Sequence, residues 1–293
     1  MQKLPFLIEE KSGPTLSDLE ARFPKTRLLV ADFYVRGVET GVALPWGFEK
    51  DNLENVDHHA PVPSMTRLIT STALACKRRV TQNTNPFDQL MLNHTDCDSV
   101  LSAAILLGHL EPDILFEKAA IASDHTGEEN DIADLLQALE HERDFALSLR
   151  CLQKLMASTP QESKVQALID KRRESRRAVQ EAVVQGSFSH IGPVWYAAFQ
   201  KEISGEFLFS ALPEAAIMVA GFPNKVDPNK WNIKVRRGAK ATEGTTLHQL
   251  NIKEFDPGFG GRWNAGSNDR GGGTVIHPSE YAQKVYQAFQ KIL

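Results

Sequence analysis

Two short segments of this 293-residue chain carry side chains that could share one metal site. The first is Asp57-His58-His59, and the second is His94-Thr95-Asp96-Cys97-Asp98. Imidazole and carboxylate groups suit Mn²⁺ or Mg²⁺, and less often Zn²⁺ or Fe²⁺. If the segments meet in the folded chain, they can hold divalent ions that bind phosphate or activate water for its hydrolysis.

The second segment offers three candidate ligands at alternate positions, His94, Asp96 and Asp98. Side chains two residues apart in an extended loop can point the same way, so these three could converge on one or two ions. A plainer interpretation stays open, in which Asp98 only caps the following helix and Asp96 only makes a turn. The adjacent histidines His58 and His59 could likewise be exposed loop residues or core residues.

Both segments follow short apolar runs that are typical of buried strands. Four such runs are expected to be strands: residues 27–31, 53–56, 90–92 and 119–122. Apolar residues at helical spacing predict helices in three stretches: residues 65–76, 100–107 and 131–156. Strands that alternate with helices predict the α/β class, with a mainly parallel sheet flanked by helices.

Ligands of such sheets gather at the carboxyl ends of the strands. Candidate ligands follow all four predicted strands: Asp32, Asp57-His58-His59, His94-x-Asp96-x-Asp98 and Asp124. In a site with two ions one carboxylate commonly bridges them, and several carboxylates balance their charge. The agreement of four strand ends favours a metal site over the plainer alternatives.

The chain is expected to form two domains joined by a helix. Residues 161–185 are rich in charge and contain no glycine or proline, so we predict a connecting helix over 161–186. Its basic residues are interpreted as a solvated face, with a contact for substrate or a partner as the alternative. We predict a metal-binding catalytic domain at 1–160 and a smaller α+β substrate-binding domain at 187–293.

Composition favours a soluble globular protein. Hydrophobic residues make up 42% and charged residues 24% of the chain. The formal net charge of −4 argues against a broad basic surface wrapped around duplex nucleic acid. The three scattered cysteines predict no disulfide framework. Because we see neither a signal-peptide pattern nor an apolar run of the ~18 residues that a membrane span needs, a cytoplasmic location is expected.

On these residues the chain resembles the DHH phosphoesterase superfamily, named for its Asp-His-His motif. That group includes manganese-type inorganic pyrophosphatases, RecJ-like exonucleases and phosphodiesterases that degrade oligonucleotides. The resemblance extends over residues ~27 to 145 and rests on four segments: the strand ending at Asp32, Asp57-His58-His59, His94 to Ser99 with Ser102-Ala103-Ala104, and Ser123-Asp124-His125-Thr126-Gly127. The order departs from the family, in which the His-x-Asp-x-Asp segment usually comes first.

The resemblance implies a site with two divalent ions, Mn²⁺ or Mg²⁺. The implied metal ligands are Asp32, which would bridge the ions, and His58, His94, Asp96, Asp98 and Asp124. His59 would donate to a phosphoryl oxygen or to the leaving group, and Asp57 would orient an imidazole. The implied reaction is phosphoester hydrolysis by a water molecule that bridges both ions.

A glycine-dense segment, residues 258–274, resembles more weakly the substrate-binding domain associated with this superfamily. Its backbone amides and nearby arginines could bind phosphate. The histidine of the family signature is missing, and an arginine stands there instead. The candidate substrate-binding residues are Gly260, Gly261, Arg236, Arg262 and Arg270. A purely structural glycine turn is the alternative.

The predicted function is a divalent-metal-dependent phosphodiesterase that acts on a nucleotide or a short oligonucleotide. The alternatives are a pyrophosphatase, a non-hydrolytic nucleotide-binding protein of the same fold, and a metal-dependent amide hydrolase. The expected partner is a phosphorylated small molecule or a short oligonucleotide. No membrane partner is expected, and the chain could form a homodimer.

Overall fold

The computed structural model describes residues 6–9, 13–82 and 86–292. Internal contacts divide the chain into two compact units. The first contains Met1–Asp124 and Glu129–Arg172, and the second contains His125–Glu128 and Arg173–Leu293. Within the described ranges, no helix has both the length and the apolar character that crossing a membrane requires.

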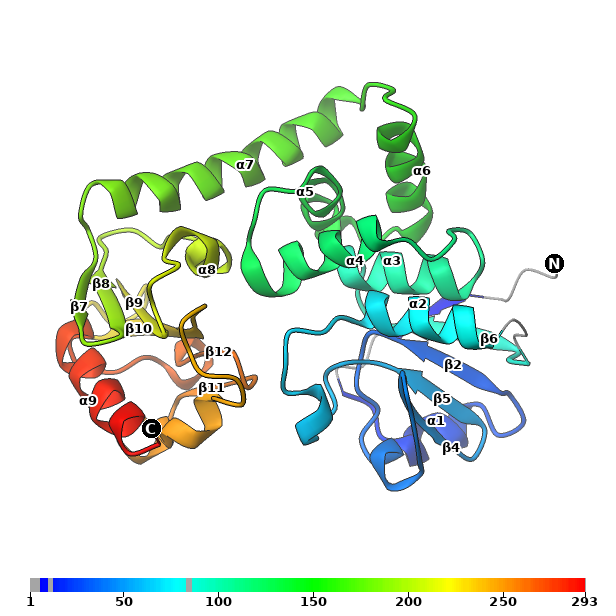
Figure 1. The fold of residues 1–293 in the computed structure, drawn as a ribbon, viewed down its shortest axis with the longest axis horizontal. Coiled ribbons are helices and arrows are strands. Elements are labelled where there is room, and N and C mark those ends of the chain that lie inside the picture. The colour runs from blue at the N-terminus through cyan, green and yellow to red at the C-terminus, as the bar shows by residue number, and fades with distance from the viewer. Residues whose placement is uncertain (1–5, 10–12, 83–85, 293) are drawn as a thin grey trace. The chain divides into compact units, whose positions relative to one another are not determined.

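A six-stranded mixed sheet forms the centre of the first unit (Figure 1). Its strands, in the order β1-β6-β2-β5-β4-β3, are β1 (Phe6–Ile8), β6 (Gln89–Leu92), β2 (Leu28–Ala31), β5 (Leu53–Val56), β4 (Gly47–Lys50) and β3 (Val42–Leu44). The first four are parallel, whereas β4 and β3 are antiparallel additions. The α/β class is therefore right, but a mainly parallel sheet is not confirmed. Short turns between β3, β4 and β5 force antiparallel pairing.

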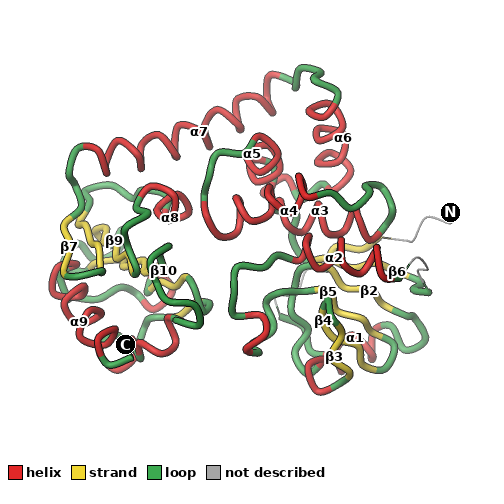
Figure 2. Tube along the Cα trace, in the orientation of Figure 1, coloured by secondary structure: helices red, strands yellow, loops and turns green. Residues whose placement is uncertain are grey.

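Seven helices of the described chain begin in the first unit (Figure 2). They are α1 (Leu16–Arg22), α2 (Ser71–Thr81), α3 (Cys97–Leu106), α4 (Ile114–Ile121), α5 (Asp131–Ala138), α6 (Phe145–Met156) and α7 (Ser163–Val184). Helix α3 packs on β2 and β6, and α2 packs on β5. Helix α7 continues into the second unit after Arg172. Shorter turns of 3-10 helix occupy Val38–Thr40, Pro63–Met65 and Glu140–Glu142.

The central strands of this sheet are buried on both faces. Strands β2 and β6 are apolar, as buried parallel strands usually are. Strand β5 instead carries the buried polar residues Glu54 and Asn55. Trp46 Nε1 donates to Glu54 at 2.8 Å and Arg78 pairs with the same carboxylate, while Asn55 accepts from the backbone of Val35 at 3.0 Å. These partners satisfy polar groups that would otherwise make burial costly.

Three sequence-based expectations for this unit are wrong. The single helix expected at 131–156 is two helices, α5 and α6, because a 3-10 turn at Glu140–Glu142 and a new N-cap at Asp144 separate them. The helix expected from residue 65 begins at Ser71, because Thr70 is its N-cap and its side chain accepts from the backbone of Ala73. The strand expected at 119–122 is the end of α4, followed by a π-helical turn at Ala122–Thr126 that contains Asp124. A short apolar run does not by itself distinguish a strand from a buried helix, and alanine favours the helix.

The second unit is built on another six-stranded sheet, which is mostly antiparallel. Its strands, in the order β11-β12-β10-β9-β8-β7, are β11 (Gly260–Gly261), β12 (Ala265–Ser267), β10 (Trp231–Arg237), β9 (Ile217–Pro223), β8 (Val194–Ala198) and β7 (Ser189–Ile191). Only β8 and β9 pair in parallel within this sheet. The helices are α8 (Leu208–Ala211) and α9 (Pro278–Gln290), with 3-10 turns at Gly205–Phe207, Leu247–Leu250, Ile252–Glu254 and Asp269–Gly271.

Both faces of this second sheet are covered. Side chains alternate between the faces along a strand, so Ile217 and Val219 of β9 join one core while Met218 and Ala220 join the other. The first core includes residues of α9, and the second includes residues of α8. This arrangement fixes which side chains of the neighbouring strand β10 share a face.

The short segment His125–Glu128 packs with the second unit although it directly follows Asp124 of the first. The carbonyl of Gly127 accepts from Arg176 Nε at 3.3 Å and from Ser210 Oγ at 3.2 Å. Gly127 has a φ of +66°, and a Cβ there would lie 2.4 Å from the carbonyl oxygen of Glu206. Glycine is therefore required at this position by both conformation and space.

Candidate metal centre

Asp32 follows β2 and is almost completely buried. Its φ is 58°, in the left-handed region that aspartate enters more readily than most residues. Its backbone N–H donates to Val56 at 3.0 Å, and its Oδ2 accepts from Ser99 Oγ at 2.6 Å. The turn after β2 and the first turn of α3 therefore fix the direction of this carboxylate.

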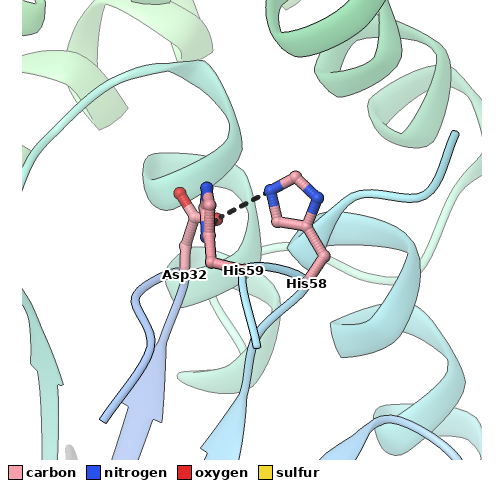
Figure 3. Close-up of side chains that lie close together, drawn as sticks. All are labelled: Asp32, His58 and His59. Atoms are coloured by element: carbon pink, nitrogen blue, oxygen red, sulfur yellow. Dashed lines mark ion pairs between the residues drawn. The ribbon is translucent and has the colours of Figure 1, made fainter. Parts of the chain in front are cut away.

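His58 lies after β5 and faces three carboxylates. Its Nε2 is 3.7 Å from Asp32 Oδ1, 3.6 Å from Asp98 Oδ2 and 3.2 Å from Asp124 Oδ2. Figure 3 shows both histidines of the Asp-His-His segment beside Asp32, with the ion pair from His58 drawn. We call His58, Asp32, Asp98 and Asp124 the first half of the candidate centre.

The second half of the centre shares Asp32 and adds two residues from the loop after β6. His94 Nε2 lies 3.2 Å from Asp32 Oδ2 and 3.2 Å from Asp96 Oδ2. The other ring nitrogen of His94 contacts the side-chain oxygen of Asn93, which orients the imidazole. Asp32 thus places Oδ1 near His58 of the first half and Oδ2 near His94 of the second.

The structure also shows how the two alternate aspartates are used locally. Asp96, rather than Asp98 or Ser99, is the N-cap of α3, and its Oδ1 accepts from Ser99 N at 2.9 Å. Its other oxygen is the one near His94, so one side chain serves both purposes. The alternative in which Asp98 only caps this helix is therefore wrong, because the helix begins at Cys97 and its N-cap is Asp96.

Asp98 lies in α3, but its carboxylate is bound by the first turn of α2. Its Oδ2 accepts from Ser71 N and its Oδ1 from Thr72 N, both at 2.7 Å. These are free N–H groups in the first turn of α2, where the helix dipole favours an anion. The side chain is completely buried, so its orientation toward His58 is set by this contact.

Asp57 and His59 form a pair beside the two halves. Asp57 Oδ1 lies 2.6 Å from His59 Nδ1, and its Oδ2 accepts from the backbone N–H of His59 at 2.9 Å. The opposite ring nitrogen, Nε2, is buried and has no hydrogen-bond partner among the described residues. One side of the His59 ring is thus fixed while the other is available.

Burial and charge perturb the ionisation of this cluster strongly. Burial opposes the charged form of His58, but Asp124, Asp98 and Asp32 more than compensate and raise its pKa to about 10. Burial likewise opposes charge on His94, yet Asp96 and Asp32 raise its pKa to about 11. Burial, followed by the charges of Asp32 and Asp124, raises the pKa of Asp98 well above its usual range.

The donor set fits a divalent cation. Carboxylate and imidazole groups gather around Asp32: the ligand atoms of Asp32, His94 and Asp96 lie within 4.8 Å of one another, and so do those of Asp32, His58 and His59. Asp32 Oδ1 is buried and accepts no hydrogen bond from the described residues, which is a costly state for a carboxylate oxygen. A cation would satisfy that oxygen and relieve the repulsion among the buried aspartates.

A cavity of about 860 Å³ opens in the second unit. Its lining includes four residues named as substrate-binding candidates: Arg236, Arg270, Gly260 and Gly261. Arg262 is exposed and does not line this cavity in the described structure. Arg236 Nη1 also donates to the carbonyls of Gly205 and Glu206, both at 2.8 Å, so this arginine holds one wall of the cavity.

The sequence interpretation overlooked several supporting residues. Ser99 and the first turn of α2 carry no metal-ligand signature, although Ser99 lies within the matched segment. Lys234 lines the cavity and pairs with Glu202 at 2.6 Å. Lys234 and Arg236 are two residues apart on β10, so the period of a strand could have identified them as neighbours on one face.

No protein-family model matches the sequence, and no curated protein sequence matches it. Among solved structures, the chain is similar to a pGpG-specific phosphodiesterase, PggH, from Vibrio cholerae. The two chains are 11% identical, with 91% of this chain and 99% of that chain covered, and the TM-score is 0.47. A likeness at this level assigns neither a family nor an activity to the chain.

Proposed function

We propose that this protein is a phosphoesterase that uses two divalent ions, Mn²⁺ or Mg²⁺, to hydrolyse a phosphodiester in a nucleotide or short oligonucleotide. The observation that carries the proposal is the pair of ligand clusters that share Asp32. The resemblance of the matching segments to the DHH superfamily supports the same chemistry.

One ion would be held by Asp32, His94 and Asp96, and the other by Asp32, His58, Asp98 and Asp124. When bound, such ions would supply Lewis acidity and lower the pKa of a water molecule enough for it to act as a nucleophile near neutral pH.

The remaining residues of the site position the substrate and move protons. Asp57 fixes the His59 ring through Nδ1, and Nε2 is proposed to donate to a phosphoryl oxygen or to the leaving group. Ser99 and the first turn of α2 keep Asp32 and Asp98 from rotating. Fixed ligands lower the cost of reorganisation during the reaction.

The cavity of the second unit is proposed as a binding site for phosphorylated substrate. Arg236 and Arg270 supply positive charge, whereas Lys234 is paired with Glu202 of the same lining, and the glycine-rich wall exposes backbone amides that suit phosphate. Arg262 is proposed as a further phosphate contact from outside this cavity. A volume of about 860 Å³ is larger than pyrophosphate needs and suits a nucleotide, which favours a diester over pyrophosphate.

The proposal is tested with metal-stripped protein and a panel of phosphates, with Mn²⁺, Mg²⁺, Co²⁺ or Zn²⁺ restored in turn. The panel contains bis-p-nitrophenyl phosphate, linear and cyclic dinucleotides, a nucleoside monophosphate and pyrophosphate. We expect metal-dependent hydrolysis of a diester by the unmodified protein, and none by Asp98→Ala or Asp32→Ala. The matched control is Asp88→Ala, which removes an exposed carboxylate paired with Arg27.

Each alternative function has its own outcome in this experiment. Full activity of Asp32→Ala with Mn²⁺ would exclude the two-ion scheme. Hydrolysis of pyrophosphate without any diester would identify a pyrophosphatase. Nucleotide binding without turnover under any metal would indicate the non-hydrolytic binding protein, and activity on amides alone would indicate a different metal chemistry.

A further inference from the structure

Three polar side chains are buried together in the core of the second unit: Asp256, Asn268 and Tyr281. Asp256 Oδ2 accepts from Asn268 Nδ2 at 2.9 Å and from Tyr281 Oη at 3.0 Å. Burial, and then the charge of Asp256, raise the pKa of Tyr281, so its hydroxyl stays protonated and donates. Burying a carboxylate costs free energy even when two donors bind it, so a structural or functional role for Asp256 is expected.

Asn268 connects this cluster to the backbone on both sides. Its Oδ1 accepts from Ile233 N at 2.7 Å, and its own N–H donates to Ile233 O at 3.2 Å. Its carbonyl accepts from Gly271 N at 3.0 Å and from Gly273 N at 3.1 Å. One side chain and its peptide groups therefore attach the glycine-dense loop to strand β10.

The same loop, residues 258–273, forms a large part of the cavity wall through Gly258, Gly260, Gly261, Gly266, Ser267 and Arg270. Strand pairing fixes part of this loop, because β11 pairs with β12 and β12 pairs with β10. The glycines that follow Ser267 lie outside this pairing, have no side chains to pack and lose the most backbone entropy on ordering. The two ends of the loop also lie close together, because a Cβ at Gly271 would lie 2.4 Å from the Cα of Gly258. The shape of the part after Ser267 therefore depends on anchors such as Asn268.

We infer that Asn268, oriented by Asp256 and Tyr281, is a positioning residue that holds the glycine-rich loop in the shape that binds phosphorylated substrate. This inference rests on the proposed function of the cavity. Asn268 is completely buried, so it does not contact the substrate itself. It acts through its hydrogen bonds to the backbone of Gly271, Gly273 and Ile233.

The geometry suggests variants that separate the charge of Asp256 from its role as an acceptor. Both donors reach the same oxygen of Asp256, so Asp256→Asn can keep both hydrogen bonds with its amide oxygen. Asp256→Ala removes the acceptor, and Asn268→Asp places a second carboxylate against Asp256. Tyr281→Phe removes one donor, and Tyr286→Phe on the same helix removes an exposed hydroxyl as the matched control.

Two measurements are made on the full-length protein loaded with Mn²⁺. Hydrogen exchange of peptides covering residues 258–273 is followed without substrate. Steady-state hydrolysis is followed with the dinucleotide of the panel that the unmodified protein cleaves fastest. It is also followed with bis-p-nitrophenyl phosphate, a small diester that is expected to depend on the metal centre alone.

In Asn268→Asp and Asp256→Ala we expect faster exchange in the loop and a KM for the dinucleotide raised about tenfold, with kcat changed less than about threefold. The kinetics with bis-p-nitrophenyl phosphate should stay unchanged. The loop exchange rate and the dinucleotide KM of Tyr281→Phe should lie between those of these variants and those of the control. Asp256→Asn should have values close to those of the unmodified protein.

Unchanged loop exchange in folded Asn268→Asp protein would overturn the inference, whatever the substrate. Faster exchange with an unchanged dinucleotide KM would overturn it as well, because the loop shape would then not matter for binding. Failure of the proposed function gives a different result, since the unmodified protein would then cleave no dinucleotide. In that case hydrogen exchange of residues 258–273 is measured again with each dinucleotide of the panel added. If no dinucleotide slows the exchange, the inference is overturned too.

Discussion

The hydroxyl of Ser99 donates to Oδ2 of Asp32 at 2.6 Å across 67 positions of sequence. Both residues are buried, and the contact joins the first turn of α3 to the end of β2. It occupies one lone pair of the carboxylate that both halves of the candidate centre share. The orientation of the shared carboxylate therefore depends on a residue that is not itself a ligand candidate.

Replacing Ser99 with alanine should weaken metal binding without unfolding the protein. Removing a group that orients a ligand typically lowers metal affinity about 10- to 100-fold. Activity of Ser99→Ala should be low at limiting Mn²⁺ and recover at high Mn²⁺, and titration calorimetry should show the weaker binding directly. Ser102→Ala is the matched control, because Ser102 Oγ donates only to the carbonyl of Ser99 one turn along the same helix. Equal effects of the two substitutions would contradict the role of Ser99.

Metal binding should release protons. The raised pKa values of His58, about 10, and His94, about 11, mean that both rings are protonated at neutral pH before an ion binds. An ion binds only the neutral ring, so apparent Mn²⁺ affinity should rise between about pH 6 and pH 9. Calorimetry in two buffers with different ionisation enthalpies measures the protons released. Affinity that does not change with pH would show that the rings are already neutral.

The same shifts predict how the stability of the metal-free protein depends on pH. A histidine whose pKa is higher in the folded protein than in the unfolded chain, where it is about 6.5, stabilises the fold. This stabilisation is complete below about pH 6.5. This stabilisation is lost as the pH rises through the folded values of about 10 and about 11. The urea midpoint of the metal-free protein should therefore fall from pH 7 upward, and a midpoint that rises over this range would refute the assignment.

The buried pair of Arg78 and Glu54 should matter for stability and not for metal binding. Both side chains are almost fully buried, and Trp46 donates to the same carboxylate. Arg78→Met leaves Glu54 without its counter-charge, so we expect a loss of about 3–5 kcal/mol in the free energy of unfolding. Adding Glu54→Gln should recover part of that loss. Urea denaturation measures both, and Arg27→Met in the exposed pair with Asp88 should have far less effect.

Two adjacent glycines of the cavity wall should respond differently to alanine. At Gly261 φ is +153° and a Cβ would lie 2.3 Å from Ala265 O, so Gly261→Ala should cost about 1–3 kcal/mol of stability. At Gly260 a Cβ meets nothing within 4 Å, so Gly260→Ala should fold normally and weaken substrate binding only. Thermal unfolding and KM distinguish the two effects. Equal loss of stability in both variants would contradict this difference.

Much of the candidate site could be predicted because its ligands follow apolar strands. The strands expected at 27–31, 53–56 and 90–92 are present at 28–31, 53–56 and 89–92, and the side chains after them converge. The order of the motifs along the chain does not prevent their ligands from meeting, because β2 lies between β6 and β5 in the sheet. The changed order of the motifs is thus compatible with one shared edge.

Other features required contacts that a single sequence does not contain. The run before Asp124 is helical because tertiary packing and alanine content, rather than apolar character alone, decide its conformation. The attachment of Asp98 to α2 depends on two elements meeting in space, and so does the network of Asp256. The roles assigned to individual ligands, the domain bounds and the substrate-binding role of Arg262 stay predictions.

The segment His125–Glu128 makes the two units inseparable by a single cut in the gene. A fragment that begins at Arg173 would lack the Gly127 carbonyl to which Arg176 and Ser210 donate. A fragment that ends at Arg172 would retain those four residues without the groups that they pack against. Either unit expressed alone is therefore expected to be less stable than the same unit in the intact chain, because these four residues pack with the second unit while the first unit continues on both sides of them.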